Sequence, residues 1–253
     1  MAAYWRLNGY YDPIKGKGLY EAISERKSCR SFLSAPTAEQ WDELKALAED
    51  FALPGVRMEL GLCDNAFFSP FFGLLMKFEN VQRFAAIITT DDEAESVVNA
   101  GISGEMLMLA AVRAGLGGCW VAGTYKRGEA GSVLREGEKL RAVIALGVPQ
   151  EKPTLPIARK RKALSDICRG DFASAPPVMD DVARAVQAAP SAVNLQPWRL
   201  TYTTENELSI SVGRPMQRLD FGIAVCHAML AVGNRSVQYT LAEDGLSARL
   251  ELS

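Results

Sequence analysis

The sequence GISGEMLMLA at residues 101–110 has a counterpart 121 residues later, GIAVCHAMLA at residues 222–231. The two segments align without a gap, and glycine, isoleucine, methionine, leucine and alanine fall at matching positions. Similarity at a fixed offset indicates an internal repeat, although two buried helices can also share apolar residues by chance. The repeat predicts a chain made of two similar halves.

The residues around these two segments predict a similar order of elements. Before residue 150, apolar periodicity predicts helices at 19–28, 37–51 and 101–115 and strands at 57–63, 84–90 and 140–148. After residue 177, it predicts helices at 178–188 and 222–237 and strands at 198–204, 207–212 and 248–253. Thr37 and Gln40 have the spacing of a capping box at the start of the second helix.

This order divides the chain into three parts. Residues 1–150 are expected to form the first half and residues 178–253 the second half. Residues 151–177 contain prolines and a basic cluster, which is typical of a connecting segment. The basic cluster could also be a solvated part of the connection with no ligand.

The composition argues against several classes of function. The 253 residues are 48% hydrophobic and 23% charged, as expected for a globular protein, and the formal net charge is -2. This charge gives no general attraction to nucleic acid or anionic lipid. The N-terminus lacks the pattern of a signal peptide, and the apolar stretch at 66–76 is too short to span a bilayer. We therefore expect a cytoplasmic protein with no nucleic-acid or membrane partner.

The chain has few residues suited to acid–base or metal chemistry. His227 is its one histidine, and the five cysteines are scattered without a CxxC pair. Neither a metal site nor a catalytic triad is indicated. His227 lies in an apolar helix, which favours a hydrogen-bonded core residue over an acid–base group. If the chain is an enzyme, a bound cofactor is expected to carry the chemistry.

Two short motifs carry groups suited to binding an anionic ligand. RKSCRSF at 26–32 offers two arginines and a serine, which can hydrogen-bond phosphate oxygens, although a solvated basic helix end would have the same composition. APSAVNLQPW at 189–198 places Ser191, Asn194 and Gln196 between two prolines. The prolines stiffen the turn, and the amides offer donors and acceptors for a polar ring edge.

Together, RxSxRxF and APSxxNxQPW resemble the FMN-dependent nitroreductase family. Two further segments match, AGLGGCWVAG at 114–123 and ARKRKALSDI at 158–167. The resemblance implies an α+β, nitroreductase-like fold with two pseudo-repeated αββαβ halves, whose central, mostly antiparallel sheets are flanked by helices. It also implies FMN as cofactor, NADH or NADPH as electron donor and a small-molecule acceptor.

The arrangement of the motifs departs from the common family member. There, the PSxxNxQPW segment follows RxSxR by a few tens of residues, whereas here the helix expected at 37–51 takes that place. The second half, in turn, lacks RxSxR and the glycine-rich segment. The chain resembles a subgroup in which two protomers are fused and each has lost half of a site. This implies an internal duplication with one FMN per chain, which allows a monomer.

The resemblance assigns the cofactor contacts to both halves of the chain. The expected phosphate contacts are Arg26, Lys27, Ser28, Arg159 and Arg161, with Arg30 toward the ribityl or pyrimidine side. Pro190, Ser191, Ala192, Asn194 and Gln196 are expected to line the isoalloxazine, and Val121, Ala122 and Gly123 to pass its N5. The glycines at 115, 117 and 118 are expected to let the main chain approach the flavin closely. No catalytic side chain is implied, because flavin N5 carries the hydride.

The implied reaction is a two-step hydride relay from NADH or NADPH to an electron-poor acceptor such as a nitroaromatic or a quinone. Two alternatives stay open: a different flavin reaction, such as dehalogenation or dehydrogenation, and a non-catalytic flavin-binding protein. Phe67, Phe68, Phe71 and Phe72 could cover the flavin or pack as ordinary core residues. The basic neighbours of Cys29 could lower the pKa of its thiol.

Overall fold

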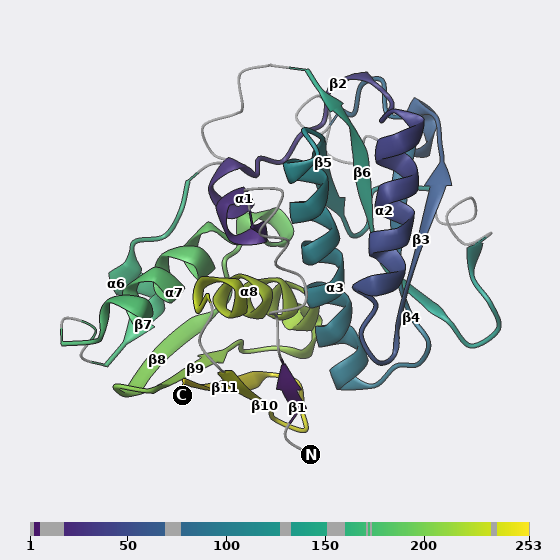
Figure 1. Ribbon diagram of the computed structural model, residues 1–253. Helices are drawn as coiled ribbons and strands as arrows, with labels where there is room; N and C mark the ends of the chain where they lie inside the picture. Colours follow the sequence, from purple (N-terminus) through teal and green to yellow (C-terminus); the bar gives the residue numbers. More distant parts are fainter. Residues whose placement is uncertain are drawn as a thin grey trace.

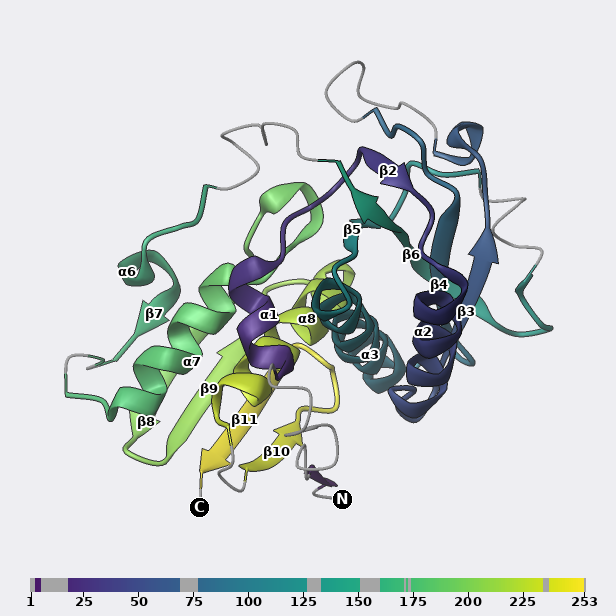
Figure 2. The same ribbon diagram turned by 45° about the horizontal axis from the view of Figure 1, so that its top comes forward.

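The computed structural model describes residues 3–5, 18–68, 77–126, 133–150, 160–170, 172, 174–233 and 237–252, with only the backbone for 3–5 and Asn65. Two sheets lie on either side of two packed helices, α3 (Ala94–Arg113) and α8 (Arg218–Ala231), as Figures 1 and 2 show. The described chain is therefore organised around this helix pair.

The first half builds the five-stranded sheet. Its helices are α1 (Leu19–Glu25), α2 (Ala38–Asp50) and α3, and its strands are β2 (Phe32–Ser34), β3 (Val56–Leu62), β4 (Arg83–Thr89), β5 (Gly117–Val121) and β6 (Lys139–Pro149). The capping box at the start of α2 is confirmed, because the side chains of Thr37 and Gln40 each bond the other's backbone N–H. This cap fixes where α2 begins.

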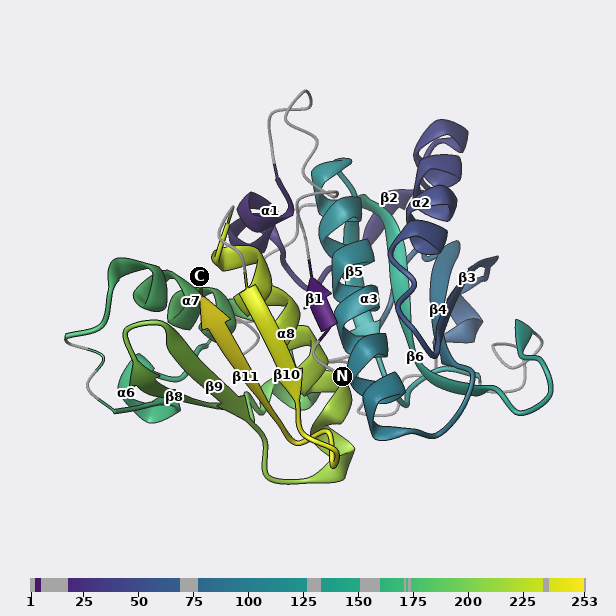
Figure 3. The ribbon, with the colours of Figure 1, turned by 60° about the horizontal axis from the view of Figure 1, so that its bottom comes forward.

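The second half builds the six-stranded sheet, which Figure 3 shows from below. Its elements are α6 (Leu164–Ile167), β7 (Cys168–Arg169), α7 (Pro177–Ala188), β8 (Arg199–Thr204), β9 (Glu207–Ser211), α8, β10 (Val237–Leu241) and β11 (Ser247–Leu252). Strand β1 (Ala3–Trp5), from the start of the chain, pairs antiparallel with β10 and so lies in this sheet.

The two sheets share one strand order. In the first half β5, β6, β4 and β3 are successive antiparallel neighbours, and in the second half β10, β11, β9 and β8 are. The elements from α2 to β6 and from α7 to β11 thus both follow the order αββαββ, with one strand more than the expected αββαβ. The α+β class with mostly antiparallel sheets is confirmed.

Two helix boundaries differ most from the sequence prediction. Helix α8 ends at Ala231 rather than 237, because Gly233 adopts a left-handed φ of 68° and the chain then enters β10. Helix α3 begins at Ala94, seven residues before the predicted start at 101. There the Asp91 carboxylate accepts a hydrogen bond from the backbone N–H of Glu93, which helps to start the helix ahead of its apolar run.

Helices α3 and α8 cross where two glycines meet. A Cβ on Gly101 would lie 2.3 Å from the Leu219 carbonyl oxygen, and a Cβ on Gly222 would lie 2.0 Å from the Val98 carbonyl oxygen. Gly101 and Gly222 are 121 residues apart, and so are Val98 and Leu219. The contact is therefore reciprocal, as in an interface between two copies of one surface.

The core divides into two clusters. The larger one spans both halves around α3 and α8, and the smaller one contains Phe67, Phe68, Phe78 and Phe84. Phe67 and Phe68 are 1% and 4% exposed, so ordinary packing accounts for them, while Phe71 and Phe72 lie outside the described residues. Within the described ranges, no helix is both long and apolar enough to cross a bilayer.

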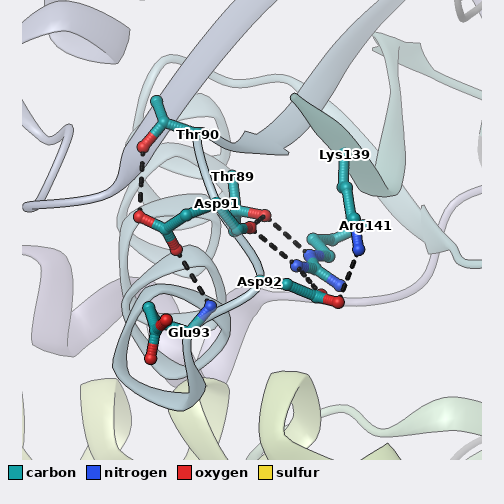
Figure 4. A network of polar contacts seen from close by, with 7 residues as sticks. All are labelled: Thr89, Thr90, Asp91, Asp92, Glu93, Lys139 and Arg141. Atoms are coloured by element: carbon teal, nitrogen blue, oxygen red, sulfur yellow. Dashed lines mark hydrogen bonds and ion pairs between the residues drawn. The ribbon is translucent and has the colours of Figure 1, made fainter. Parts of the chain in front are cut away.

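Arg141 fastens the loop between β4 and α3 to strand β6 (Figure 4). Its guanidinium donates to the Thr89 hydroxyl at 2.8 Å, to the Asp91 carbonyl at 2.9 Å and to the Asp92 carboxylate at 2.6 Å. Lys139 also binds Asp92, but from a half-exposed position. These bonds to Lys139 and Arg141 hold the pKa of Asp92 at about 2.

Replacing Arg141 by methionine should lower the free energy of unfolding by about 2 kcal/mol, because the buried Thr89 hydroxyl and the loop carbonyl lose charged donors. Lys139→Met is the matched control and should change stability by less than about 0.5 kcal/mol, since an exposed ion pair contributes little. Urea denaturation of both variants measures the difference. Equal losses of unfolding free energy in the two variants would show that Arg141 acts only as a surface charge.

Candidate functional site

The basic segment at residues 26–30 follows α1 and runs beside β5. The Cys29 N–H donates to the Gly118 carbonyl at 2.8 Å, and Ser28 and Gly118 form a parallel bridge. A Cβ on Gly117 would lie 2.9 Å from the Cys29 Cβ, and one on Gly118 would lie 2.7 Å from the Met108 sulfur. These two glycines are thus needed for close packing within the protein. Gly115, with a φ of 78°, follows the end of α3.

Arg26 and Arg30 bring buried guanidinium atoms to this segment. Nε and Nη1 of Arg26 and Nε of Arg30 are buried and make no hydrogen bond. Both arginines lie close enough to Cys119 to oppose the rise in its pKa that burial causes. Lys27, between them, is exposed. The basic segment therefore presents more donors than the described residues satisfy.

The segment at residues 189–198 forms a tight, strained turn. Val193, Asn194 and Gln196 have φ values of 46°, 56° and 48°, in the left-handed region that residues other than glycine seldom adopt. The Ser191 hydroxyl accepts a hydrogen bond from the Gln196 N–H at 2.8 Å and closes the turn. Strain of this kind persists where surrounding contacts impose it, and it is common at functional sites.

The amide side chains of this turn bind residues 160–162. Asn194 accepts from Nη1 of Arg161 at 3.1 Å and donates to the Lys160 carbonyl at 2.8 Å. Gln196 accepts from the Lys162 N–H at 2.8 Å, and its backbone carbonyl accepts from the Lys162 ammonium at 3.0 Å. In this geometry Asn194 holds the guanidinium of Arg161 in place.

Arg161 links the turn of the second half to the basic segment of the first. Its Nη2 donates to the Ala188 carbonyl at 3.0 Å, while its Nε is buried without a hydrogen-bond partner. Burial, followed by repulsion from Arg26, lowers the pKa of Arg161. Two partly desolvated guanidinium groups from distant parts of the chain therefore lie within electrostatic range of each other.

The other expected site residues are placed as follows. Val121 is buried at the end of β5, whereas Ala122 and Gly123 are exposed and a Cβ on Gly123 would meet no atom within 4 Å. Pro190 is buried beside the turn, Ala192 is exposed, and Arg159 lies outside the described residues. Burial raises the pKa of Cys29 and outweighs the lowering effect of its basic neighbour Arg30.

Three polar residues of this region were missed in the sequence: Glu105, Trp120 and Asp220. Glu105, His227 and Trp120 form a buried group that reaches Arg26, and Asp220 binds the strained turn. Glu105 is the one acidic residue in the apolar run at 101–110, so a lone carboxylate there was the available signal. His227, by contrast, is the buried hydrogen-bonded histidine that was expected.

Asp220 caps the strained turn from the first turn of α8. Both of its carboxylate oxygens lie within hydrogen-bond distance of the Ala192 N–H, at 3.0 and 3.2 Å. Burial raises the pKa of Asp220 to about 6, against the lowering effect of the Ala192 bond. The charged form of this carboxyl is therefore disfavoured in the folded protein.

This raised pKa predicts a loss of stability as the pH increases. The stabilising effect of protonated Asp220 is fully present below its unfolded pKa of about 4 and is lost as the pH passes about 6, a change of about 3 kcal/mol. Asp220→Asn should remove this part of the pH profile of urea denaturation. Glu39→Gln, at an exposed carboxyl, should leave it intact, and an unchanged profile in Asp220→Asn would contradict the assignment.

Comparisons with known proteins identify a family model and solved structures that are similar to this chain. The family model described as "Putative TM nitroreductase" matches residues 18–232, and no protein with a curated description matches the sequence. A solved "putative nitroreductase" from Thermotoga maritima msb8 is 24% identical, over 93% of this chain and 94% of that chain, with a TM-score of 0.68. This similarity shows that the fold is nitroreductase-like.

Two other solved structures match less of the chain. A nitroreductase family protein from Streptococcus pneumoniae TIGR4 is 13% identical, over 59% of this chain and 98% of that chain, with a TM-score of 0.47. An FMN-dependent nitroreductase from Clostridium difficile R20291 is 18% identical, over 60% of this chain and 95% of that chain, with a TM-score of 0.42.

Proposed function

Because this chain belongs to the nitroreductase family described by that model, we propose that it binds FMN and uses NADH or NADPH to reduce a small electron-poor acceptor such as a nitroaromatic or a quinone. FMN would supply the hydride-transferring centre at its N5. The protein would bind and orient the reactants and stabilise negative charge on the reduced ring.

One observation carries the proposal: the cluster of Arg26, Arg30 and Arg161 holds buried guanidinium nitrogens that make no hydrogen bond. Buried charged donors without hydrogen-bond partners are costly, and neighbouring like charges raise the cost further. A phosphate group offers several anionic oxygens that can accept from guanidinium donors at once. The cluster therefore fits the phosphate of FMN.

The residues that would hold FMN come from both halves. Arg26, Lys27, Ser28, Arg30 and Arg161, with Arg159, would surround the phosphate and ribityl chain. Pro190, Ser191, Ala192, Asn194 and Gln196 would lie along the isoalloxazine, with Val121, Ala122 and Gly123 near N5. Asn194 would act partly through Arg161, since its amide binds that guanidinium. No side chain needs to transfer a proton in the first step, the hydride transfer from the nicotinamide.

We further propose that the chain arose by fusion of two protomers and keeps one complete site. The shared strand order and the reciprocal contacts of Gly101 and Gly222 support an internal two-fold relation. The halves would be residues 1–150 and 178–253, joined by residues 151–177. Loss of complementary half-sites would leave one FMN per chain, so that a monomer would suffice.

The absorbance spectrum of the purified protein tests the proposed function. We expect a bound flavin that NADH or NADPH bleaches and that an acceptor such as a quinone restores. A bound flavin that neither nicotinamide reduces would favour another flavin reaction or a non-catalytic role. A protein that is colourless and cannot be reconstituted with FMN would overturn the proposal.

A further inference from the structure

Glu105 lies at the centre of a buried polar group beside Arg26. Its side chain is 0% exposed, and its Oε2 accepts from the Trp120 indole N–H at 2.7 Å. Its Oε1 lies 2.9 Å from Nε2 of His227 and 3.7 Å from Nε of Arg26. This carboxylate therefore joins α3, α8, β5 and the basic segment.

The donors and acceptors around His227 and Glu105 fix the number of protons that these two side chains share. Nδ1 of His227 lies 2.8 Å from the Ala185 carbonyl oxygen, which can only accept, so Nδ1 carries a hydrogen. The contact between Nε2 and Glu105 Oε1 then needs one further proton, held by either atom. Whichever atom holds it, Glu105 and His227 together carry no net charge.

The fold supplies an internal comparison for this group. At the offset of 121 residues, Glu105 corresponds to Cys226, and His227 corresponds to Met106. Cys226 and Met106 line a small apolar cavity with Ile102, Met229 and Tyr239. The same helix pair is thus packed by apolar residues at one place and by a polar group at the other. Helix packing alone does not require the polar group.

We propose that Glu105 is a positioning residue that orients Arg26 toward the phosphate of FMN, an inference that rests on the proposed function. The carboxylate lies 3.7 Å from Nε of Arg26 and would orient the guanidinium by this ion pair, while Nη1 has no hydrogen-bond partner and is left for the ligand. Trp120 and His227 hold the carboxylate from two other sides. Orientation in advance of binding lowers the entropic cost of capturing the anion.

Glu105→Gln tests this inference without changing the net charge, because an amide beside a neutral His227 is also uncharged. The amide NH₂ can donate to Nε2 of His227, but Nε of Arg26 then faces an NH₂ group in place of a carboxylate oxygen and loses its ion pair. We expect the affinity for FMN to fall about 10- to 100-fold, by analogy with other residues that orient a ligand-binding group. The affinity for riboflavin, which lacks the phosphate, should be unchanged.

The ratio of the affinity for FMN to the affinity for riboflavin distinguishes positioning from a structural role. Met106→Leu, in the next position of α3, is the matched control and should keep the wild-type ratio. If Glu105→Gln does not fold, Glu105→Asp replaces it, and its shorter carboxylate should lower the ratio by a smaller factor. A ratio equal to that of the wild type in the folded variant would overturn the inference. A wild-type protein that binds neither flavin would instead overturn the proposed function.

Discussion

Replacing Arg26 by alanine should lower the affinity for FMN by about 100-fold or more, which corresponds to about 3 kcal/mol. The variant removes buried guanidinium donors that have no other hydrogen-bond partner, and a charge-assisted bond to phosphate is among the strongest single contacts in proteins. Fluorescence titration of the apoprotein with FMN measures the change, and riboflavin should show a much smaller loss.

A substitution in the second half should also lower the affinity for FMN, but by a smaller factor. Asn194→Ala leaves Arg161 without one of its acceptors, so we expect a loss of about 10-fold in FMN affinity. Arg26→Ala and Arg161→Ala should be non-additive in a double-mutant cycle, because both would act on one phosphate. Additive effects, or a loss of affinity from only one half, would mean that the two halves do not share a site.

Replacing Gly222 by alanine should lower the free energy of unfolding by about 3 kcal/mol or more. The added Cβ would lie 2.0 Å from the Val98 carbonyl oxygen and 3.0 Å from the Gly101 Cα, which are backbone atoms that cannot rotate away. The two helices would have to separate, and the core that spans both halves would lose close packing. Gly101→Ala should have a similar effect, since the contact is reciprocal.

Gly213→Ala provides the control for this prediction. A Cβ at that position would meet only Oε1 of Gln217, at 4.0 Å, and the φ of Gly213 is not left-handed. Its stability in thermal or urea denaturation should stay within about 0.5 kcal/mol of the wild type. If Gly222→Ala were equally tolerated, the close crossing of α3 and α8 would not be what joins the halves.

Much of the fold could be predicted from local pattern. The capping box of α2, the buried strands and the similarity between 101–110 and 222–231 are all visible in the sequence. Strands β5 and β10 were missed for different reasons. The glycines at 117 and 118 obscured the first. The predicted helix was extended past the end of its apolar run at Val232 to Val237, which is the start of the second. Helix ends depend on backbone geometry that side-chain periodicity does not report.

The site was partly predictable because its motifs are short and local. The structure brings Arg26, Arg161 and Asn194 close together, as the resemblance implied. Glu105, Trp120 and His227 could not be found in this way. Their contacts depend on how closely α3 and α8 cross, and this distance is set by Gly101 and Gly222 rather than by any motif around Glu105. The bonds of the strained turn's amides to residues 160–162 were not visible in the sequence either.

A titration of the intact apoprotein with FMN tests the central claim most directly. If the two halves contribute to one site, binding should saturate at one FMN for each 253-residue chain. Saturation at two FMN per chain, or no binding at all, would contradict this account.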